Sequence, residues 1–494
     1  MRRWFAAALL PVAIGSVDAQ QDRRLDSMMV RVSAFMGERV DTSGVPFAFP
    51  TFIDAILSTH PVSQQARLVA EQARSDLRVA WGAFDPTVTA TWDRKRYAGI
   101  PYYNYLESEL KIPLPIGADV TLAYDRTMGQ FTNPDRRAVG NGTFSAGVSI
   151  PLGQRIITDE RRNALQQARA ARDAGAADQT GIVNRLIFEA AKDYGAWYES
   201  WRRRIIAQEG EALAEFRLQA VRLRVAIGES APIDTIEATL ELQRRLVTRF
   251  EAEAMFYVST LRVTAYLWDD AGRPEPLPLD AKPVLDGIER SAIDSTRLAS
   301  LLDLATRRNP DLLKVQARVR QAEAQRLFTM QGLLPYAEAK LAGVAERGDD
   351  VNFFARERLD NNYKAGLQIK SPLLFLRETG RFSAAGQRLE FQELEFDRLR
   401  REVEYDARAA IFDLANLERL LDLQSANLRN ATLLRDAEQI RFENGESTLL
   451  IVNIRERLVL DEAVKLASLE AKVASSRGAL AVATGDRSLM LPPP

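Results

Sequence analysis

Hydrophobic residues follow two different periods along this chain, a helical one and a two-residue one. Stretches rich in Ala, Gln, Arg and Leu with helical spacing begin at Pro61 and Pro310, and they end before Pro86 and Pro335. The two prolines are 25 residues apart in both copies. Because a duplicated frame of this kind is specific, the sequence predicts two tandem structural repeats.

After each second proline the period changes to alternation, which predicts strands at about 87–150 and 336–371. Val88, Ala90 and Trp92 alternate with threonines, and the same pattern recurs at 144–150 and 363–370. The stretch YAEAKLAG after Pro335 is a weaker case. Strict alternation gives a strand one apolar and one polar face. The apolar face packs on a second sheet in a soluble sandwich, whereas it faces lipid in an outer-membrane barrel.

The first repeat contains an additional alternating pair near 105–126 that the second repeat lacks. Its two arms, at 110–114 and 120–124, are joined through PLPIGAD. Tyr102, Tyr103 and Tyr105 cluster beside it, near a predicted loop, and would suit an aromatic girdle at a membrane interface.

The longest predicted elements are helices at about 155–268 and 377–485, which contain very few prolines. A helix over 161–226 would be on the order of 100 Å long at 1.5 Å per residue. Apolar residues recur every seven positions in both returning helices, the coiled-coil signature. The two series are Ile233, Leu240, Val247, Ala254, Leu261 and Trp268, and Val452, Val459, Leu466, Val473 and Leu480. Helices this long must pack against their own partners and against other chains.

Each pair of long helices is joined by a turn that opens with R-x-x-x-G-E-S. The residues of the two turns are Arg224, Gly228, Glu229 and Ser230, and Arg441, Gly445, Glu446 and Ser447. A glycine ends a helix easily because it adopts the left-handed conformation. The serine is expected to cap the next helix, and Pro232 suits a first helical turn.

The chain divides into six predicted segments. Residues 1–19 have two arginines, a short apolar run and Val17-Asp18-Ala19, the layout of a secretory signal peptide. An N-terminal arm (20–50) leads to repeat 1 (51–268). A proline-rich connector (269–297), repeat 2 (298–487) and a short tail (488–494) follow. No later segment has 18 consecutive apolar residues, so no transmembrane helix is expected.

Composition gives little support for catalysis or for nucleic-acid binding. The chain has 66 basic and 67 acidic residues, no cysteine and a single histidine, His60. His60 precedes Pro61 at a helix start, where a packed or solvated side chain is the ordinary case. No phosphate-binding loop, metal-ligand cluster or activated nucleophile appears, so no catalytic residue, cofactor or metal is predicted and an enzyme is not expected.

The duplicated order of helix, strands, long helix, turn and helix, with R-x-x-x-G turns at Gly228 and Gly445, resembles the TolC-type outer-membrane factor family. The resemblance covers about 51–487. It implies a mainly helical protein with membrane strands, three protomers that share one outer-membrane β-barrel, and a periplasmic tunnel of coiled-coil hairpins. The family usually has two strands per repeat, so the additional pair either enlarges the barrel or lies outside the membrane as a loop.

The resemblance also implies partners and a constriction. The turns would contact a periplasmic adaptor and an inner-membrane transporter. Asp234 and Glu237, six and nine residues after Gly228, match acids that form a tunnel constriction in some relatives, whereas Ile451 and Ile454 stand at the corresponding places in repeat 2. Acids in a first helical turn also complement the helix dipole, which is the alternative interpretation.

The leading functional prediction is an outer-membrane exit duct for tripartite efflux or type I secretion, a passive homotrimeric channel in contact with outer-membrane lipid. The alternative is an exported periplasmic coiled-coil scaffold with a small β domain. A monomeric porin conflicts with the amount of helix, because porins are nearly all strand.

Overall fold

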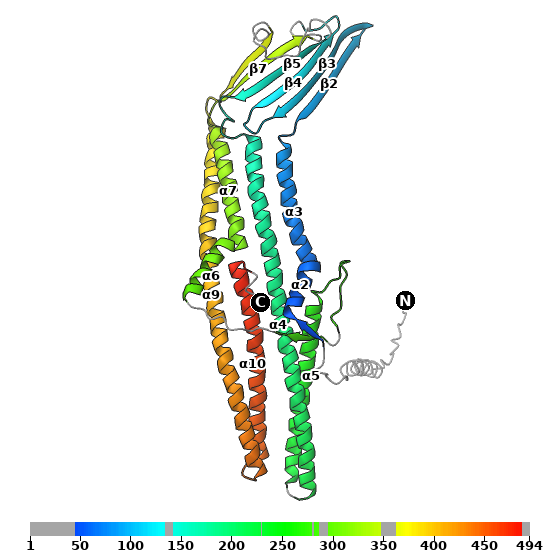
Figure 1. Cartoon of the computed structure of the whole chain (residues 1–494), viewed down its shortest axis with the longest axis vertical. Helices are drawn as coiled ribbons and strands as arrows, with labels where there is room; N and C mark the ends of the chain where they lie inside the picture. The colour runs from blue at the N-terminus through cyan, green and yellow to red at the C-terminus, as the bar shows by residue number, and fades with distance from the viewer. Residues whose placement is uncertain are drawn as a thin grey trace, which may run out of the picture.

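The computed structural model describes residues 45–133, 142–228, 230–278, 281–285, 295–346 and 362–486. The predicted signal peptide, most of the N-terminal arm, Glu229 and the tail from 488 onward lie outside the described residues. A β-sheet occupies one end of a long layer of helices, and the two helix-hairpin turns lie at the other end (Figure 1).

The two repeats contain the same helices in the same order. The helices of repeat 1 are α3 (Pro61–Gly82), α4 (Glu160–Ala226) and α5 (Pro232–Thr264). Those of repeat 2 are α7 (Pro310–Gln331), α9 (Leu376–Glu443) and α10 (Leu449–Thr484). α4 and α9 have 67 and 68 residues, so each is about 100 Å long at 1.5 Å per residue. The predicted long helices are confirmed.

The prolines that define the repeat frame stand at the first position of α3 and α7, each after a capping residue. His60 Nδ1 accepts a hydrogen bond from the Val62 amide at 3.2 Å. Asn309, at the matching place in repeat 2, accepts from the amides of Asp311 and Leu312. A side-chain acceptor at this position satisfies an amide that the helix leaves unpaired, which explains why both helices begin here.

The long helices form a single curved layer. Near the turns, α4 lies between α5 and α10, and α10 lies between α4 and α9. Toward the sheet, α3 and α7 flank α4, and α7 also packs on α9. Within one chain, α5 and α9 are therefore the outer helices of the half that carries the turns.

The two heptad series have opposite environments. In α10, Val452, Val473 and Leu480 are buried between α4 and α9. In α5, the members that lie within the helix are exposed: Ile233, Leu240, Val247, Ala254 and Leu261. Trp268 lies beyond the end of α5. The apolar stripe of α5 therefore has no partner within the described part of its own chain.

Six strands form one antiparallel sheet in the order β2-β3-β4-β5-β7-β8. The strands are β2 (Thr87–Tyr97), β3 (Ile100–Pro113), β4 (Asp119–Met128), β5 (Thr143–Pro151), β7 (Tyr336–Glu346) and β8 (Tyr363–Lys370). β2 and β8 are its edge strands. β7 contains the YAEAKLAG stretch, so this weaker strand prediction is confirmed.

The additional hairpin of repeat 1 is β3-β4, and it is inserted into the sheet between β2 and β5. The alternative that it lies apart from the sheet as a loop is therefore wrong. Tyr102, Tyr103 and Tyr105 lie within β3, close to the turn that joins it to β2.

The strand register places apolar residues on one face of the sheet. Val88 lies opposite Leu110, Leu110 opposite Leu122, and Leu122 opposite Ala146. The polar residues share the other face in the same way, for example Thr121 opposite Lys111. Apolar side chains from both edges are exposed, including Val88 at 77% and Leu367 at 65%. The predicted two-faced sheet is confirmed, and no other described element of the chain covers its apolar face.

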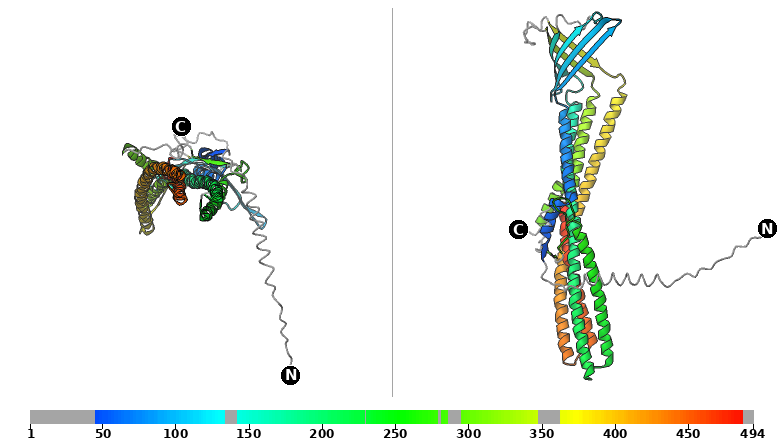
Figure 2. Two further views of the ribbon diagram at one scale, coloured as in Figure 1. Left: turned by 90° about the horizontal axis from the view of Figure 1, so that it is seen from below. Right: turned by 90° about the vertical axis from the view of Figure 1, so that its right-hand side faces the viewer.

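The short elements α2 (Phe49–Thr59), β1 (Pro46–Ala48) and β6 (Lys282–Val284) lie at mid-length, on one face of the helix layer (Figure 2). A cluster that includes several aromatic side chains is buried there. It joins α2, the parallel pair of β1 and β6, and α4. Tyr194 of α4 is fully buried there, and its hydroxyl contacts the carbonyls of Phe47 and Val284. α6 (Ser295–Arg308) packs nearby on α9 and α10. This cluster ties the arm and the connector to the first long helix.

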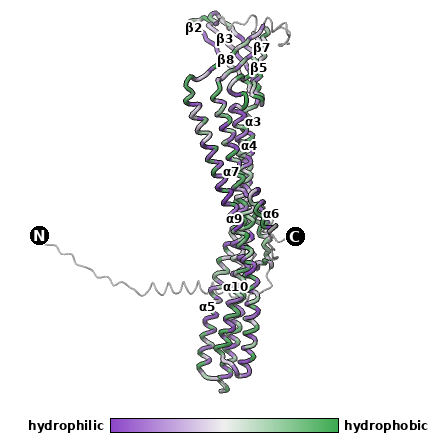
Figure 3. Tube along the Cα trace, turned by 90° about the vertical axis from the view of Figure 1, so that its left-hand side faces the viewer, coloured by the Kyte–Doolittle hydropathy of each residue, from purple (hydrophilic) through white to green (hydrophobic). Residues whose placement is uncertain are grey.

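Hydrophilic and hydrophobic residues are interspersed along the helices (Figure 3). Among the described residues, no helix combines the length and the apolar character needed to cross a membrane.

Candidate functional site

The two hairpin turns at the far end of the helix layer are the first part of the candidate site. Gly228 and Gly445 both adopt left-handed backbone conformations, with φ of 81° and 79°. The Gly445 amide donates to the Phe442 carbonyl at 3.0 Å and the Glu446 amide to the Arg441 carbonyl at 2.8 Å. These two bonds form a Schellman motif, which requires a residue with positive φ. The predicted role of the glycines is therefore confirmed.

The expected role of the serines is wrong. The N-cap residues of α5 and α10 are Ala231 and Thr448, and neither makes a side-chain capping bond. Ser447 instead donates to Glu438 Oε1 at 2.5 Å. Ser230 and Ser447 each stand one residue before the N-cap position, so neither is placed to accept from the first amides of the following helix.

The two turns contact each other. The guanidinium of Arg224 lies over the ring of Phe442, with 5.5 Å between Cζ and the ring centroid. Next to the turns, on the side toward the sheet, a small apolar cluster joins three helices through Leu218, Ala238 and Leu449. Arg441 is turned toward Glu438, 3.5 Å away, and Glu446, 4.0 Å away. Arg224 and Arg441 therefore occupy different environments although their sequence contexts match.

Asp234 and Glu237 lie in the first two turns of α5 and are half-buried. Neither forms an ion pair within 4 Å among the residues that the structure describes. They precede Glu241 and Arg244 by seven residues, so all four lie on one face of α5. Glu241 and Arg244 line a groove between α5, α4 and α10. Asp234 and Glu237 therefore lie on the same face of α5 as the groove, between the groove and the end of the hairpin.

Above the turns, charged residues link the first hairpin to the second. Arg217 of α4 pairs with Glu456 of α10 and also donates to Asn453 at 2.8 Å. Glu241 of α5 accepts from Arg457 of α10 at 3.1 Å. The side chains of Arg217, Glu241 and Glu456 are all at least 86% buried. Such pairs fix two elements in one relative position, because a buried charge without its partner is costly.

Sequence reasoning did not find these links. Arg217 and Glu456 are 239 residues apart, and each stands in a helix that is rich in arginine and glutamate. Neither residue differs from its neighbours in any local pattern. Only the packing of α4 on α10 distinguishes them, and that packing has no signal in a single sequence.

A further set of contacts holds the sheet on the helices. Asp119, at the start of β4, pairs with Arg161 of α4 at 2.8 Å and with Lys111 of β3 at 3.1 Å. Gln331, at the end of α7, accepts from the Thr158 amide at 3.1 Å and donates to its carbonyl at 2.8 Å. Asp119 therefore joins the sheet to α4, and Gln331 joins the end of α7 to the segment that precedes α4.

No group of three or more histidine, cysteine or acidic residues in the described part of the chain could hold a metal ion. The groups described so far are ion pairs and helix-end contacts.

Comparison with known proteins gives a family match for the second repeat. Residues 301–486 match the family described as outer membrane efflux protein. None of the curated protein sequences compared with the chain matches it.

Several solved structures share the fold over most of their length. The Campylobacter jejuni CmeC outer membrane channel is 12% identical, with a TM-score of 0.61 over 88% of this chain and 85% of that one. The Vibrio cholerae outer membrane protein VceC is 15% identical, with a TM-score of 0.59 over 89% and 96%. The open state of the Neisseria gonorrhoeae MtrE outer membrane channel is 16% identical, with a TM-score of 0.61 over 89% of each chain.

These matches confirm the predicted resemblance to TolC-type outer-membrane factors and the predicted mainly helical fold with an antiparallel sheet. The solved structures are described as outer membrane channels or as an outer membrane protein, which is the location expected for this chain.

Proposed function

We propose that three copies of this chain form the exit duct of a tripartite efflux or type I secretion system. The observation that carries the proposal is the six-stranded sheet with one uncovered apolar face, joined end-on to helices about 100 Å long. A soluble protein rarely exposes such a large apolar surface. Lipid would cover this face, and the helices would extend from the membrane into the periplasm.

The outer elements of the chain support an assembly. β2 and β8 are edge strands of the sheet, and α5 and α9 are the outer helices of the half that carries the turns. Both outer helices expose apolar residues, among them Val247 of α5 and Phe412 of α9. If copies are arranged around a common axis, β8 of one copy can pair with β2 of the next, so that no strand edge remains unpaired. The same arrangement would place α9 of one copy against α5 of the next. Edges and stripes of this kind are normally covered in native proteins.

The number of copies rests on the resemblance. Three sheets of six strands would give a barrel of eighteen strands, a size at which barrels leave an aqueous channel. The polar face of the sheet, with Thr121, Lys111 and Gln368, would then line that channel.

The mechanism would be passive. The turns at Gly228 and Gly445 would contact the adaptor, and Asp234 and Glu237 would form a constriction near the end of the tunnel. Separation of the hairpins would break the links of Arg217 and of Glu241 to α10. The similar proteins are channels, which supports a role without catalysis.

The alternative, a soluble periplasmic scaffold with a small β domain, predicts a different result when the cell envelope is fractionated. The full chain is expressed with its N-terminal segment, and the cell envelope is separated into soluble and membrane fractions. We expect the protein in the outer-membrane fraction, resistant to washing with carbonate and urea and released by detergent. Recovery in the soluble periplasmic fraction would exclude the duct and support the scaffold.

A second experiment identifies the class of solute that crosses the duct. A deletion strain tested against a panel of toxic compounds, and for missing secreted proteins, separates efflux from secretion. Sensitivity to compounds with normal secretion would assign efflux, and the opposite result would assign secretion.

A further inference from the structure

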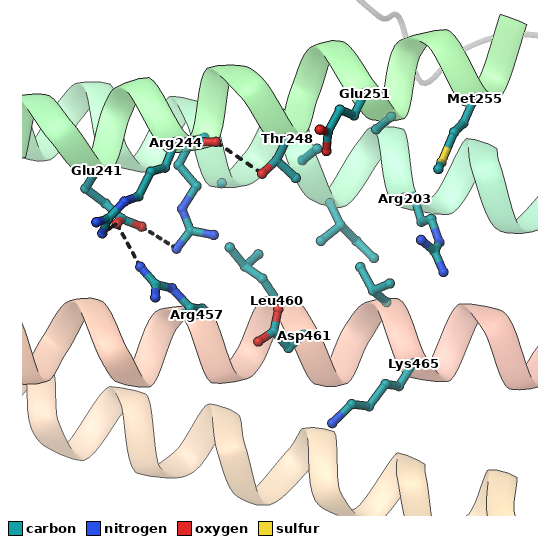
Figure 4. Close-up of a pocket in the computed structure, with 16 residues that line it drawn as sticks. Arg203, Glu241, Arg244, Thr248, Glu251, Met255, Arg457, Leu460, Asp461 and Lys465 are labelled. Carbon is teal, nitrogen blue, oxygen red and sulfur yellow. Dashed lines mark hydrogen bonds and ion pairs between the residues drawn. The ribbon is translucent and has the colours of Figure 1, made fainter.

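A groove between α5, α4 and α10 is lined by five basic and three acidic side chains. Its volume is about 520 Å³, within the range of small-molecule sites. The basic residues that line it are Arg203, Arg244, Arg245, Arg457 and Lys465. Three acids, Glu241, Glu251 and Asp461, also line it. Two of the basic residues pair with acids outside the lining, Arg203 with Glu199 at 2.6 Å and Lys465 with Glu462 at 2.8 Å. Figure 4 shows these side chains around the space between the two hairpins.

The charges converge at one carboxylate. Glu241 is buried and lies 2.7 Å from Arg245, 3.1 Å from Arg457 and 3.7 Å from Arg244, measured between nitrogen and oxygen atoms. One carboxylate neutralises one guanidinium, so this cluster has two positive charges in excess. The side chains of Arg244 and Arg457 are about half exposed, at 59% and 49%, so they can reach a further anion.

The floor of the groove is apolar. Ile206, Ala207 and Ala252 are buried beneath it, and Leu460 of α10 closes one side. Gly210 also forms part of the floor, and a Cβ there would lie 3.0 Å from Leu460 Cδ1. An apolar floor beside a cationic rim matches a molecule with an apolar body and one acidic group.

The part of the groove floor that α4 supplies lies on the side of α4 opposite the mid-length aromatic cluster. Trp197 of α4 packs in that cluster, and Ile206 follows it by nine residues. At about 100° per residue, nine residues place Ile206 half a turn away from Trp197. Figure 2 shows α2, β1 and β6 on one side of the curved helix layer.

We propose that this groove is a binding site for amphipathic organic anions, with Arg244 and Arg457 holding the acidic group and the apolar floor holding the hydrocarbon part. Guanidinium groups bind carboxylates, sulfonates and phosphates through two parallel hydrogen bonds. All lining residues come from one chain, so the site does not depend on the number of copies. Its position along a solute passage does rest on the proposed function.

The test is calorimetric titration of the full-length protein in lipid nanodiscs. Naphthalene-2-sulfonate is the probe, and naphthalene-2-methanol and 2-naphthylmethylammonium are its neutral and cationic counterparts. We expect the sulfonate to bind at least tenfold more tightly than either counterpart after subtraction of the signal from empty nanodiscs. Equal binding of the three compounds would overturn the proposal.

Two variants test whether sulfonate binding depends on the groove or only on the positive charge of the protein surface. The pair Arg244→Gln and Arg457→Gln removes the exposed guanidiniums, and Thr248→Trp fills the groove without removing a charge. Both should weaken sulfonate binding at least tenfold. A matched pair, Arg222→Gln and Arg429→Gln, removes two exposed arginines that do not line the groove and should change the affinity less than twofold.

Each variant is included only if its elution volume in size-exclusion chromatography equals that of the wild-type protein. Sulfonate binding that survives both groove variants would overturn the site. Loss of binding in the matched pair would also overturn it, because general charge would then explain the affinity. Channel conductance is recorded on the same preparations, so a missing channel with intact sulfonate binding would contradict the proposed function and leave this inference standing.

Discussion

Arg217 of α4 donates to both carboxylate oxygens of Glu456 on α10, across 239 residues of sequence. The side chains are 14% and 10% exposed, so the pair is largely withdrawn from solvent. It connects the first hairpin to the second just above the turns. If one hairpin moves away from the other, this ion pair must therefore break.

Breaking the pair from one side should destabilise the protein. Arg217→Ala leaves Glu456 buried without its guanidinium, and we expect a loss of about 3–5 kcal/mol in the free energy of unfolding. The measurement is the midpoint of thermal unfolding followed by circular dichroism. Replacing both residues with leucine should recover most of the loss, because no buried charge remains.

Arg435→Ala is the control for that experiment. Arg435 pairs with Asp436 on the surface of α9, and exposed pairs contribute about 0–1 kcal/mol. An effect of Arg217→Ala no larger than that of Arg435→Ala would contradict the structural role of the buried pair.

The acids after the first turn should influence ion selectivity. Asp234→Asn together with Glu237→Gln removes two negative charges per chain from the groove face of α5 while preserving side-chain size. We expect a lower preference for cations, measured as a shift of the reversal potential across a KCl gradient in a planar bilayer. Glu443→Gln in the second hairpin is the control. A lower unfolding temperature with unchanged selectivity would assign the two acids to the helix dipole instead.

An arginine introduced at either of two adjacent positions of β8 should affect membrane insertion differently. Leu367 lies on the apolar face of the sheet and Gln368 on the polar face. Leu367→Arg places a charge toward lipid at a cost of about 2–4 kcal/mol near the bilayer midplane, so less protein should be recovered from the outer membrane. Gln368→Arg should insert normally. Equal recovery of the two variants by quantitative immunoblot would contradict the assignment of the faces.

The exposed stripe of α5 should be an interface between copies. Val247→Lys places a charge in this stripe, whereas Thr248→Lys places it on the neighbouring groove face. We expect the first variant to dissociate or fail to assemble, and the second to keep the wild-type mass in native mass spectrometry of detergent-extracted protein. An unchanged mass for Val247→Lys would show that α5 does not contribute to the interface.

His60 should make stability depend on pH. Burial lowers the pKa of His60 below its usual value of 6.5, so the neutral ring is favoured in the folded state. This contribution to stability is fully present above pH 6.5 and is lost as the pH falls through the lowered pKa of the folded state. His60→Asn keeps a side-chain cap of the kind that Asn309 supplies in repeat 2, and it cannot titrate.

We therefore expect the fall in the unfolding midpoint between pH 7.5 and pH 5 to be smaller in His60→Asn than in wild type. Thermal unfolding at both pH values measures the difference. An identical fall in the two proteins would assign the acid sensitivity to other groups.

The elements of this fold could be predicted because their signals are local. Proline spacing marked the starts of α3 and α7, alternation marked the strands, and Gly228 and Gly445 marked the ends of the long helices. The serine caps were predicted wrongly, because α5 and α10 begin one residue later than a serine cap would require, with Ala231 and Thr448 at the N-cap positions.

Long-range pairing could not be predicted in the same way. Nothing in the sequence distinguished the exposed heptad series of α5 from the buried series of α10, since that difference depends on which helix lies at the outside of the layer. The basic groove was missed for the same reason: Arg244 and Arg457 meet only after α10 has packed beside α5. The place of β3-β4 inside the sheet likewise depends on strand neighbours and not on strand propensity.

The central claim is that assembled copies form a water-filled passage through the outer membrane. The most direct measurement is the conductance of purified full-length protein in planar lipid bilayers. We predict discrete current steps of uniform size that grow with KCl concentration and change in reversal potential in the Asp234→Asn, Glu237→Gln variant. Folded protein that enters the bilayer and carries no current, also after the Arg217–Glu456 link has been removed, would contradict the claim.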